Sequence, residues 1–410
     1  MPNVFSKALA VEHGYYYISK LLFCVRINMK TIYLDNGATT KICPAAEAAI
    51  KEANEKFFAN PASIHHAGIE ASKRLERARK TIANTLGASP EEIIFTSGGT
   101  ESNNLAIKGL SFQNPSKKHI IASKIEHDCV LNSCKWLEER GYEITFLDVD
   151  KEGFVNLQQL QNAIRPDTLL VSIIHGNNEI GTLQNLQKIY EICKKKKAIF
   201  HTDACQSFTK APLSAKMADM ITINAHKMHG PKGIGALYIR KGIQLTPLAH
   251  GGGHQQGIRS GTQNVAAAAG FEAAIKEAQK QKKQIKNMQN LRDYFIKSAL
   301  KIPNSTLNGA EGNSRLANNI NISFAGVEGE SVAALLDMEG ICCSTGSACA
   351  SKSLDPSHVI MAISNNSHER AHGSIRFTLS ASNTKKEIDF TLRALAQAVK
   401  KLRKISPLKR

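Results

Sequence analysis

Between about residue 90 and residue 240, short apolar runs alternate with segments of helical spacing, and this alternation constrains the fold more than any other feature. Strands that alternate with helices predict an α/β domain, in which a mostly parallel sheet is covered by helices on both faces. The expected strands include residues 93–95, 119–122, 169–173 and 220–223. Because ligands bind at the carboxyl ends of the strands in such sheets, functional residues are expected there.

Five polar side chains follow directly after expected strands, where a ligand would bind. They are Thr100, His127, Asn178, Asp203 and Lys227. Each of them alone has an ordinary explanation, as a loop residue, a surface charge or a structural histidine. Five such residues at one edge of a sheet are harder to explain by chance, and together they predict a polar site.

Lys227 lies between two apolar runs, directly after His226 and before a loop rich in glycine and proline. A lysine fixed between strands, with Asp203 at the end of an earlier apolar run, has the surroundings of an amine that forms a Schiff base. We therefore hypothesise that Lys227 carries pyridoxal phosphate.

A glycine-rich turn at residues 96–103, T-S-G-G-T-E-S-N, joins an expected strand to an expected helix. Glycines let the backbone approach an anion closely, and free N–H groups at the helix start, together with the Thr100 hydroxyl, can bind it. The turn matches neither G-x-G-x-x-G nor a P-loop. It predicts a phosphate site only in combination with Lys227.

The length of 410 residues predicts two domains. The expected division has a large cofactor-binding domain at residues 45–265, then a long connecting helix and a small C-terminal domain at residues 266–410. Residues 29–44 are expected to pack with the small domain. Residues 1–28 are interpreted as an extension or a start placed too early, and a mitochondrial-type presequence is the alternative.

The net charge of +18 suits an acidic partner, a phosphorylated ligand or nucleic acid. The basic clusters at residues 194–197 and 280–286 are not interleaved with aromatic residues, so we interpret them as solvated faces. Nine cysteines include no C-x-x-C, which excludes the usual zinc spacings, and no secretory signal or membrane span is evident. A cytoplasmic location without membrane or nucleic-acid contact is expected.

Taken together, the motifs resemble those of the cysteine desulfurases of the NifS/IscS type, in the class V aminotransferase group of pyridoxal-phosphate enzymes. Their order and spacing match over nearly the whole chain after Met29, in segments that include Y-L-D-N-G-A-T-T, F-T-S-G-G-T-E-S-N-N-L, N-N-E-I-G, H-T-D-A-C-Q-S, A-H-K, R-S-G-T and S-T-G-S-A-C. The resemblance implies the fold type I transferase architecture, with a smaller α+β domain. It also implies conversion of L-cysteine to L-alanine, with the sulfur passed on as a persulfide.

The resemblance assigns roles around the cofactor ring. Lys227 would hold pyridoxal phosphate and move protons at the substrate α-carbon. Asp203 would pair with the ring nitrogen, Gln206 would donate to the ring oxygen, and His127 would stack on the ring face and take part in catalysis. Asn178 would contact the cofactor and, with Arg376, hold the substrate carboxylate.

The phosphate would be held by Gly99, Thr100 and His226. Thr262 would reach it from the other subunit, so the resemblance implies a homodimer with shared active sites. Asn224 stands where the family generally has a serine that contacts the phosphate, and its amide is the candidate replacement.

Cys349 would attack the sulfur of the bound cysteine as a thiolate and keep it as a persulfide. Its loop of small residues resembles the group that supplies iron–sulfur assembly and tRNA thiolation, so the expected partners are an iron–sulfur scaffold or another sulfur acceptor. No metal is expected beyond a transient contact of Cys349 with an iron–sulfur cluster. The chain ends at Arg410, without the tail that helps longer relatives to dock the scaffold.

Other functions remain as alternatives at this point. The nearest are a selenocysteine lyase and an aminotransferase of the same group, from which a requirement for Cys349 would distinguish a desulfurase. A cofactor-free scaffold protein and a basic nucleic-acid binder are the alternatives from other classes.

Overall fold

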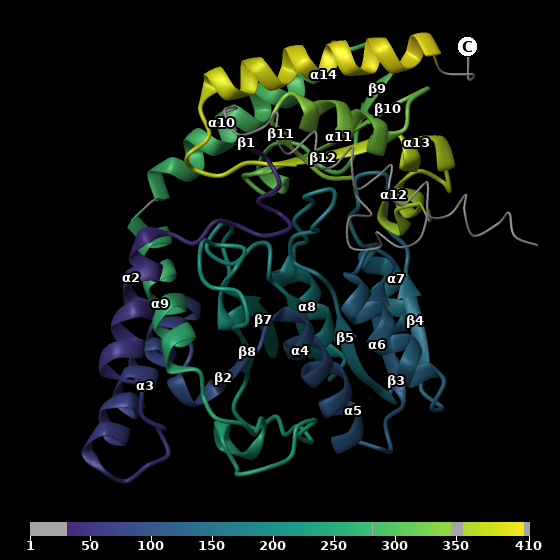
Figure 1. The fold of residues 1–410 in the computed structure, drawn as a ribbon. Helices are drawn as coiled ribbons and strands as arrows, with labels where there is room; N and C mark the ends of the chain where they lie inside the picture. Colours follow the sequence, from purple (N-terminus) through teal and green to yellow (C-terminus); the bar gives the residue numbers. More distant parts are fainter. Residues whose placement is uncertain (1–30, 281, 346–355, 406–410) are drawn as a thin grey trace, which may run out of the picture.

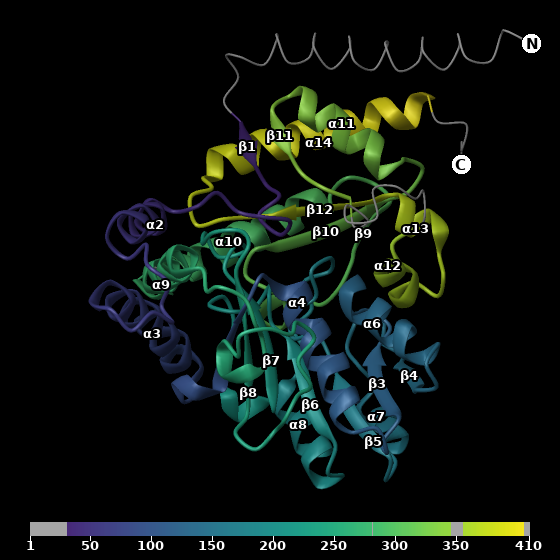
Figure 2. The same cartoon turned by 60° about the horizontal axis from the view of Figure 1, so that its bottom comes forward.

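The computed structural model describes residues 31–280, 282–345 and 356–405 of the chain. Figure 1 shows a large body of strands and helices in its lower part, with a second body above it. Figure 2 gives the same arrangement from a view turned by 60°. None of the helices in the described ranges combines the length and apolar character needed to cross a membrane.

The large body is built on a seven-stranded sheet in the order β2-β8-β7-β6-β5-β3-β4. Strand β8 runs antiparallel to both β2 and β7, and the remaining neighbours pair in parallel. The mostly parallel sheet predicted from the sequence is therefore confirmed. Its strands are β2 (Ile93–Thr96), β3 (His119–Ser123), β4 (Glu143–Leu147), β5 (Thr168–Ser172), β6 (Ile199–Asp203), β7 (Met220–Asn224) and β8 (Gly235–Ile239).

Helices cover both faces of this sheet. Alternate residues of a strand point to opposite faces, so one strand contributes apolar side chains to a core on each side. In β3, Ile121 packs into one hydrophobic core, and Ile120 and Ala122 pack into another. The helices of this body are α2 (Pro44–Lys56), α3 (His66–Leu86), α4 (Gly99–Asn104), the π-helix η3 (Leu105–Gly109), α5 (Leu110–Gln113), α6 (Asp128–Glu138), α7 (Leu157–Ala163), α8 (Leu186–Lys195) and α9 (Val265–Lys280).

The second body has its own core around two small sheets. One sheet is antiparallel, in the order β12-β10-β9, and in the other β1 pairs in parallel with β11. The strands are β1 (Ile32–Tyr33), β9 (Ser305–Leu307), β10 (Asn319–Phe324), β11 (Ile341–Cys342) and β12 (Ser374–Thr378). The helices are α10 (Lys282–Ala299), α11 (Gly329–Met338), α12 (His358–Ile363), α13 (His368–His372) and α14 (Lys385–Ile405). Short 3-10 helices complete the described chain: η2 (Pro90–Glu92), η4 (Ala215–Met217), η5 (Gln255–Gly257) and η6 (Gly312–Ser314).

The bounds of α9, α10 and α14 can be related to the sequence. The segment where a long connecting helix was expected, after residue 265, holds the helices α9 and α10, and residue 281 between them lies outside the described residues. Before α14, the Thr384 backbone N–H donates to Glu387 at 3.0 Å, and the Glu387 N–H donates to the Thr384 hydroxyl at 3.3 Å. These reciprocal bonds form a capping box, which satisfies backbone N–H groups at the start of the helix. The division into domains at residue 265 stays a prediction.

Candidate active site

The carboxyl ends of β2, β3, β5, β6 and β7 reach the same edge of the sheet, since β2 runs antiparallel to β8, which runs antiparallel to β7. Asp203 is the last residue of β6, and His127 is the N-cap of α6, which follows β3. Lys227 follows β7 by three residues. Both Asp203 and Lys227 act electrostatically on the His127 imidazole, so the fold brings these three side chains together.

Asp203 is a buried carboxylate, with 5% of its surface exposed. One oxygen, Oδ1, accepts from the Cys205 backbone N–H at 2.8 Å, and Oδ2 accepts from Asn103 Nδ2 at 2.7 Å. Within the described ranges, no cationic side chain forms an ion pair with it. Burying a charge without an oppositely charged partner costs free energy. A cationic group bound beside Asp203 would therefore stabilise the site.

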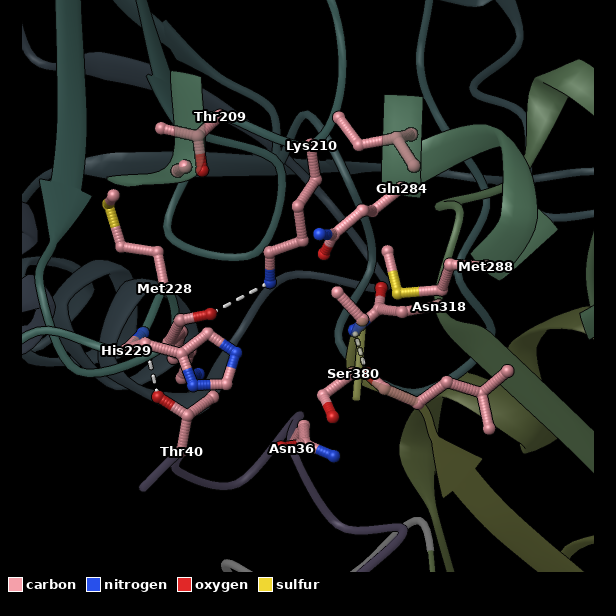
Figure 3. Close-up of a pocket in the computed structure, with 15 residues that line it drawn as sticks. Asn36, Thr40, Thr209, Lys210, Met228, His229, Gln284, Met288, Asn318 and Ser380 are labelled. Atoms are coloured by element: carbon pink, nitrogen blue, oxygen red, sulfur yellow. Dashed lines mark hydrogen bonds between the residues drawn. The ribbon is translucent and has the colours of Figure 1, made fainter. Parts of the chain in front are cut away.

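Lys227 is half-buried, and its Nζ atom makes no hydrogen bond or ion pair with the residues that the structure describes. Its backbone carbonyl accepts from Lys210 Nζ at 2.9 Å. Figure 3 shows the Lys210 side chain in the cavity that it shares with Asn318 and Ser380. The two lysines line a cavity of about 60 Å³ together with Asn318 and Ser380. Burial lowers the pKa of Lys210 to about 7. Sequence reasoning missed Lys210, because nothing local distinguishes it among 53 lysines and arginines.

The two histidines next to these residues are neutral at physiological pH. Burial lowers the pKa of His127, and its Nδ1 atom accepts from the Cys129 backbone N–H at 3.2 Å. Burial together with the charge of Lys227 lowers the pKa of His226 to about 4, and its Nδ1 atom lies 3.2 Å from the Thr39 hydroxyl oxygen.

The glycine-rich turn is packed tightly against the end of β6. A Cβ atom at Gly99 would lie 2.6 Å from Cys205 Sγ, so any larger residue there would require the Cys205 side chain to move. The Asn224 side chain lies on the same side, with Nδ2 3.5 Å from that Cβ position. Asn224 is buried, and its Oδ1 atom has no hydrogen-bond partner among the described residues. The turn begins α4, so its first N–H groups lack partners within the helix.

A second polar group lies between the two bodies. Arg376, on β12, is 3% exposed; it forms an ion pair with Asp35 at 3.0 Å and donates to the Asn178 carbonyl at 3.0 Å. In the part of the chain that the structure describes, Arg376 Nε and Asn178 Oδ1 have no partner, although both atoms are buried. Arg376 therefore has hydrogen-bonding capacity left for a carboxylate.

Three further residues predicted for the site are Gln206, Thr262 and Cys349. Gln206 is buried and donates to the Gly37 carbonyl at 2.8 Å. Thr262 is exposed on the loop before α9 and lines a separate cavity of about 190 Å³ with Ser97 and Gly233. Cys349 lies outside the described residues.

Most of the chain, residues 32–390, matches the family described as "Aminotransferase class-V". The chain belongs to this family. The class V resemblance inferred from the motifs is thereby confirmed.

Relatives of this class V protein are similar to it over most of their length. The chain is 50% identical over 385 residues to a protein of Dictyoglomus turgidum named "Cysteine desulfurase IscS", covering 93% of this chain and 97% of that one. Among solved structures, it is similar to a "NIFS-LIKE PROTEIN", with a TM-score of 0.84 and 35% identity over 90% of this chain and 99% of the other. It is also similar to "SspA in complex with cysteine", with a TM-score of 0.74 and 37% identity over 86% of this chain and 100% of that one.

The residues fit pyridoxal phosphate, the cofactor of this class V family. Asp203 offers a buried negative charge for a protonated ring nitrogen, and Lys227 offers an amine without another partner among the described residues. The tight turn at Gly99 and the buried amide of Asn224 lie beside each other at Cys205, two residues after Asp203. The assignment of each residue to a part of the cofactor stays a prediction.

Glu126, next to His127, is expected to make the stability of the protein depend on pH. It is fully buried, its Oε1 atom accepts from Ser123 Oγ at 2.5 Å and from the Ile174 N–H at 2.9 Å, and burial raises its pKa to about 8. Since the folded state holds this proton more tightly than the unfolded state, stability is lost as pH rises from the ordinary range of a glutamate through about 8. Glu126→Gln keeps an acceptor and cannot ionise, so its stability relative to wild type should grow by roughly 2 to 3 kcal/mol from pH 6 to pH 9.

Urea unfolding at the two pH values measures this difference. The exposed Glu91→Gln is the matched control, and it should follow the wild type. Equal pH dependence of wild type and Glu126→Gln would show that Glu126 does not carry the effect.

Proposed function

We propose that this protein is a pyridoxal-phosphate-dependent cysteine desulfurase, which converts L-cysteine to L-alanine and passes the sulfur to an acceptor protein. The observation that carries the proposal is Asp203, a buried carboxylate without a cationic partner among the described residues, at the same sheet edge as the unpaired amine of Lys227. The similarity to proteins named cysteine desulfurase, and to a structure in complex with cysteine, supports this substrate.

The residues of the chain would have the following roles in the reaction. When bound, pyridoxal phosphate supplies an electron sink that makes the α-carbon of the substrate acidic. Lys227 moves the proton at that carbon, and Asp203 holds the ring nitrogen protonated. The neutral imidazole of His127 would lie against the ring, where it would be available to exchange a proton.

The substrate carboxylate is assigned to Arg376, whose buried Nε atom has no partner among the described residues, and to the amide N–H donors of Asn178. Arg376 also donates to the Asn178 backbone carbonyl at 3.0 Å, so the two residues are in contact. The thiolate of Cys349 attacks the substrate sulfur, and the carbon–sulfur bond breaks. The sulfur stays on Cys349 as a persulfide, a proton added at the β-carbon forms the methyl group, and the return of a proton from Lys227 to the α-carbon completes alanine. An iron–sulfur scaffold or another sulfur-acceptor protein would then receive the sulfur.

We also propose that the enzyme is a cytoplasmic homodimer. Three large apolar side chains are exposed where α2 ends and α3 begins: Phe58 is 76% exposed, Ile64 is 95% and Ile69 is 46%. Exposed apolar groups of this size are typical of a protein interface. Thr262, exposed on its loop, would reach the phosphate of the partner subunit.

The test of the proposed function is direct. The purified protein is incubated with pyridoxal phosphate and cysteine, and the peptide that contains Cys349 is analysed by mass spectrometry. One added sulfur atom on Cys349, together with alanine in solution, is the expected result. Alanine without the added sulfur, or no alanine at all, would contradict it.

Arg376→Lys is expected to raise KM for cysteine about 10- to 100-fold, because an ammonium cannot form the two parallel hydrogen bonds that a guanidinium offers to a carboxylate. Steady-state kinetics measures the change. Arg370→Lys is the control, because Arg370 is bonded to Asn308 and the Leu307 carbonyl instead. An unchanged KM in a folded Arg376→Lys variant would remove Arg376 from the substrate site.

A further inference from the structure

Asn103 is fully buried on α4, and both hydrogens of its amide nitrogen are used within the site. Its Nδ2 atom donates to Asp203 Oδ2 at 2.7 Å and to Cys129 Sγ at 3.1 Å. Its Oδ1 atom has no partner among the described residues. Turning the amide over would place this oxygen against the Asp203 carboxylate, so the observed orientation is the one that the charge requires.

The helix that carries Asn103 changes its geometry immediately afterwards. The α-helical turns of α4 pass into the π-helix Leu105–Gly109. Single π-helical turns are frequent at functional sites, because they change the direction in which side chains project. The buried Oδ1 atom, which has no partner among the described residues, indicates that the placement of Asn103 is maintained at a cost in stability.

Cys129 continues the chain of contacts to His127. Its Sγ atom lies 3.1 Å from His127 Nδ1, and its backbone N–H donates to the same nitrogen at 3.2 Å. A backbone N–H can only donate, so Nδ1 is an acceptor and the neutral imidazole carries its proton on Nε2. Burial raises the pKa of Cys129 to about 12, which keeps it a thiol able to donate to Nδ1.

We propose that Asn103 and Cys129 are positioning residues, which hold Asp203 and His127 in place through one continuous hydrogen-bonded chain. Asn103 fixes the carboxylate that faces the ring nitrogen, and Cys129 fixes the imidazole that lies against the ring. The inference rests on the proposed function, because that function places Asp203 and His127 at the cofactor.

The first test measures cofactor binding by the apoprotein in equilibrium dialysis. Asn103→Ala is expected to weaken the affinity for pyridoxal phosphate about 10-fold, because the Asp203 carboxylate loses a charge-assisted hydrogen bond. Asn114→Ala is the matched control, since its side chain bonds the Leu110 carbonyl at the end of the same helical segment.

The second test leaves Asn103 intact and follows His127 by NMR titration of the apoprotein. Cys129→Ala removes a donor to Nδ1 and should raise the pKa of His127 by roughly half a unit to one unit, whereas Cys129→Ser keeps a donor and should restore the wild-type value. The charged and titratable groups that also act on His127 are unchanged in both variants: Asp203, Lys227, Asp128 and His358. Cys134→Ala, on the same helix, controls for the loss of a thiol.

The outcomes separate the two proposals. A wild-type apoprotein that binds no pyridoxal phosphate would contradict the proposed function, and the inference with it. The inference would be overturned if wild type and Asn103→Ala bound pyridoxal phosphate equally well. It would also be overturned if His127 titrated identically in Cys129→Ala and Cys129→Ser. Either result would leave the proposed function unaffected.

Discussion

Cys349→Ser is expected to lower alanine formation from cysteine by at least about 1,000-fold, because a serine hydroxyl cannot take the place of a thiolate that attacks sulfur. Binding of pyridoxal phosphate should remain, since no residue assigned to the cofactor changes. The measurement is alanine released per enzyme, together with the visible absorbance of the bound cofactor.

The control for this variant is Cys43→Ser. Cys43 is the N-cap of α2, a position where serine is favoured, and it lies outside the assigned site. Full activity of Cys349→Ser would identify the protein as a lyase or an aminotransferase that needs no thiol nucleophile, and would end the desulfurase proposal.

Lys227→Ala is expected to abolish covalent attachment of the cofactor and to reduce turnover at least about 1,000-fold, because the amine that moves the α-proton is lost. After reduction with borohydride, the wild-type peptide containing Lys227 should carry the mass of the cofactor, and the variant should carry none. Lys232→Ala, an exposed lysine of the same loop, is the matched control. Attachment at another lysine in the wild type would refute the assignment.

Much of the large body could be predicted from local patterns. Each strand is a short apolar run, so the expected strands at residues 119–122, 169–173 and 220–223 agree with β3, β5 and β7 within one residue at each end. Gly87, in the left-handed conformation at φ 68°, ends α3, and glycine is the residue favoured at such a helix end. These predictions succeeded because they depend on residues close together in the chain.

The partners of the site residues could not be predicted in this way. Asn103 and Asp203 are 100 residues apart in the sequence, and Arg376 and Asp35 are 341 apart. No sequence pattern around Lys210 marks it as a site residue. It is singled out only by the hydrogen bond that it donates to the Lys227 carbonyl. Such contacts depend on which elements pack together.

The sequence by itself determined the α/β class, the family and the set of residues at the carboxyl ends of the strands. It could do so because the hydrophobic period, the residue types at turns and the order of the motifs are all properties that are read along the chain. Only the tertiary structure decided that Asp203 is buried without a cation among the described residues, and that Asn103 and Cys129 join it to His127. The physical reason is desolvation: burial removes water as a partner, so the hydrogen bonds and the pKa of each group depend on neighbours that the fold brings from distant parts of the chain.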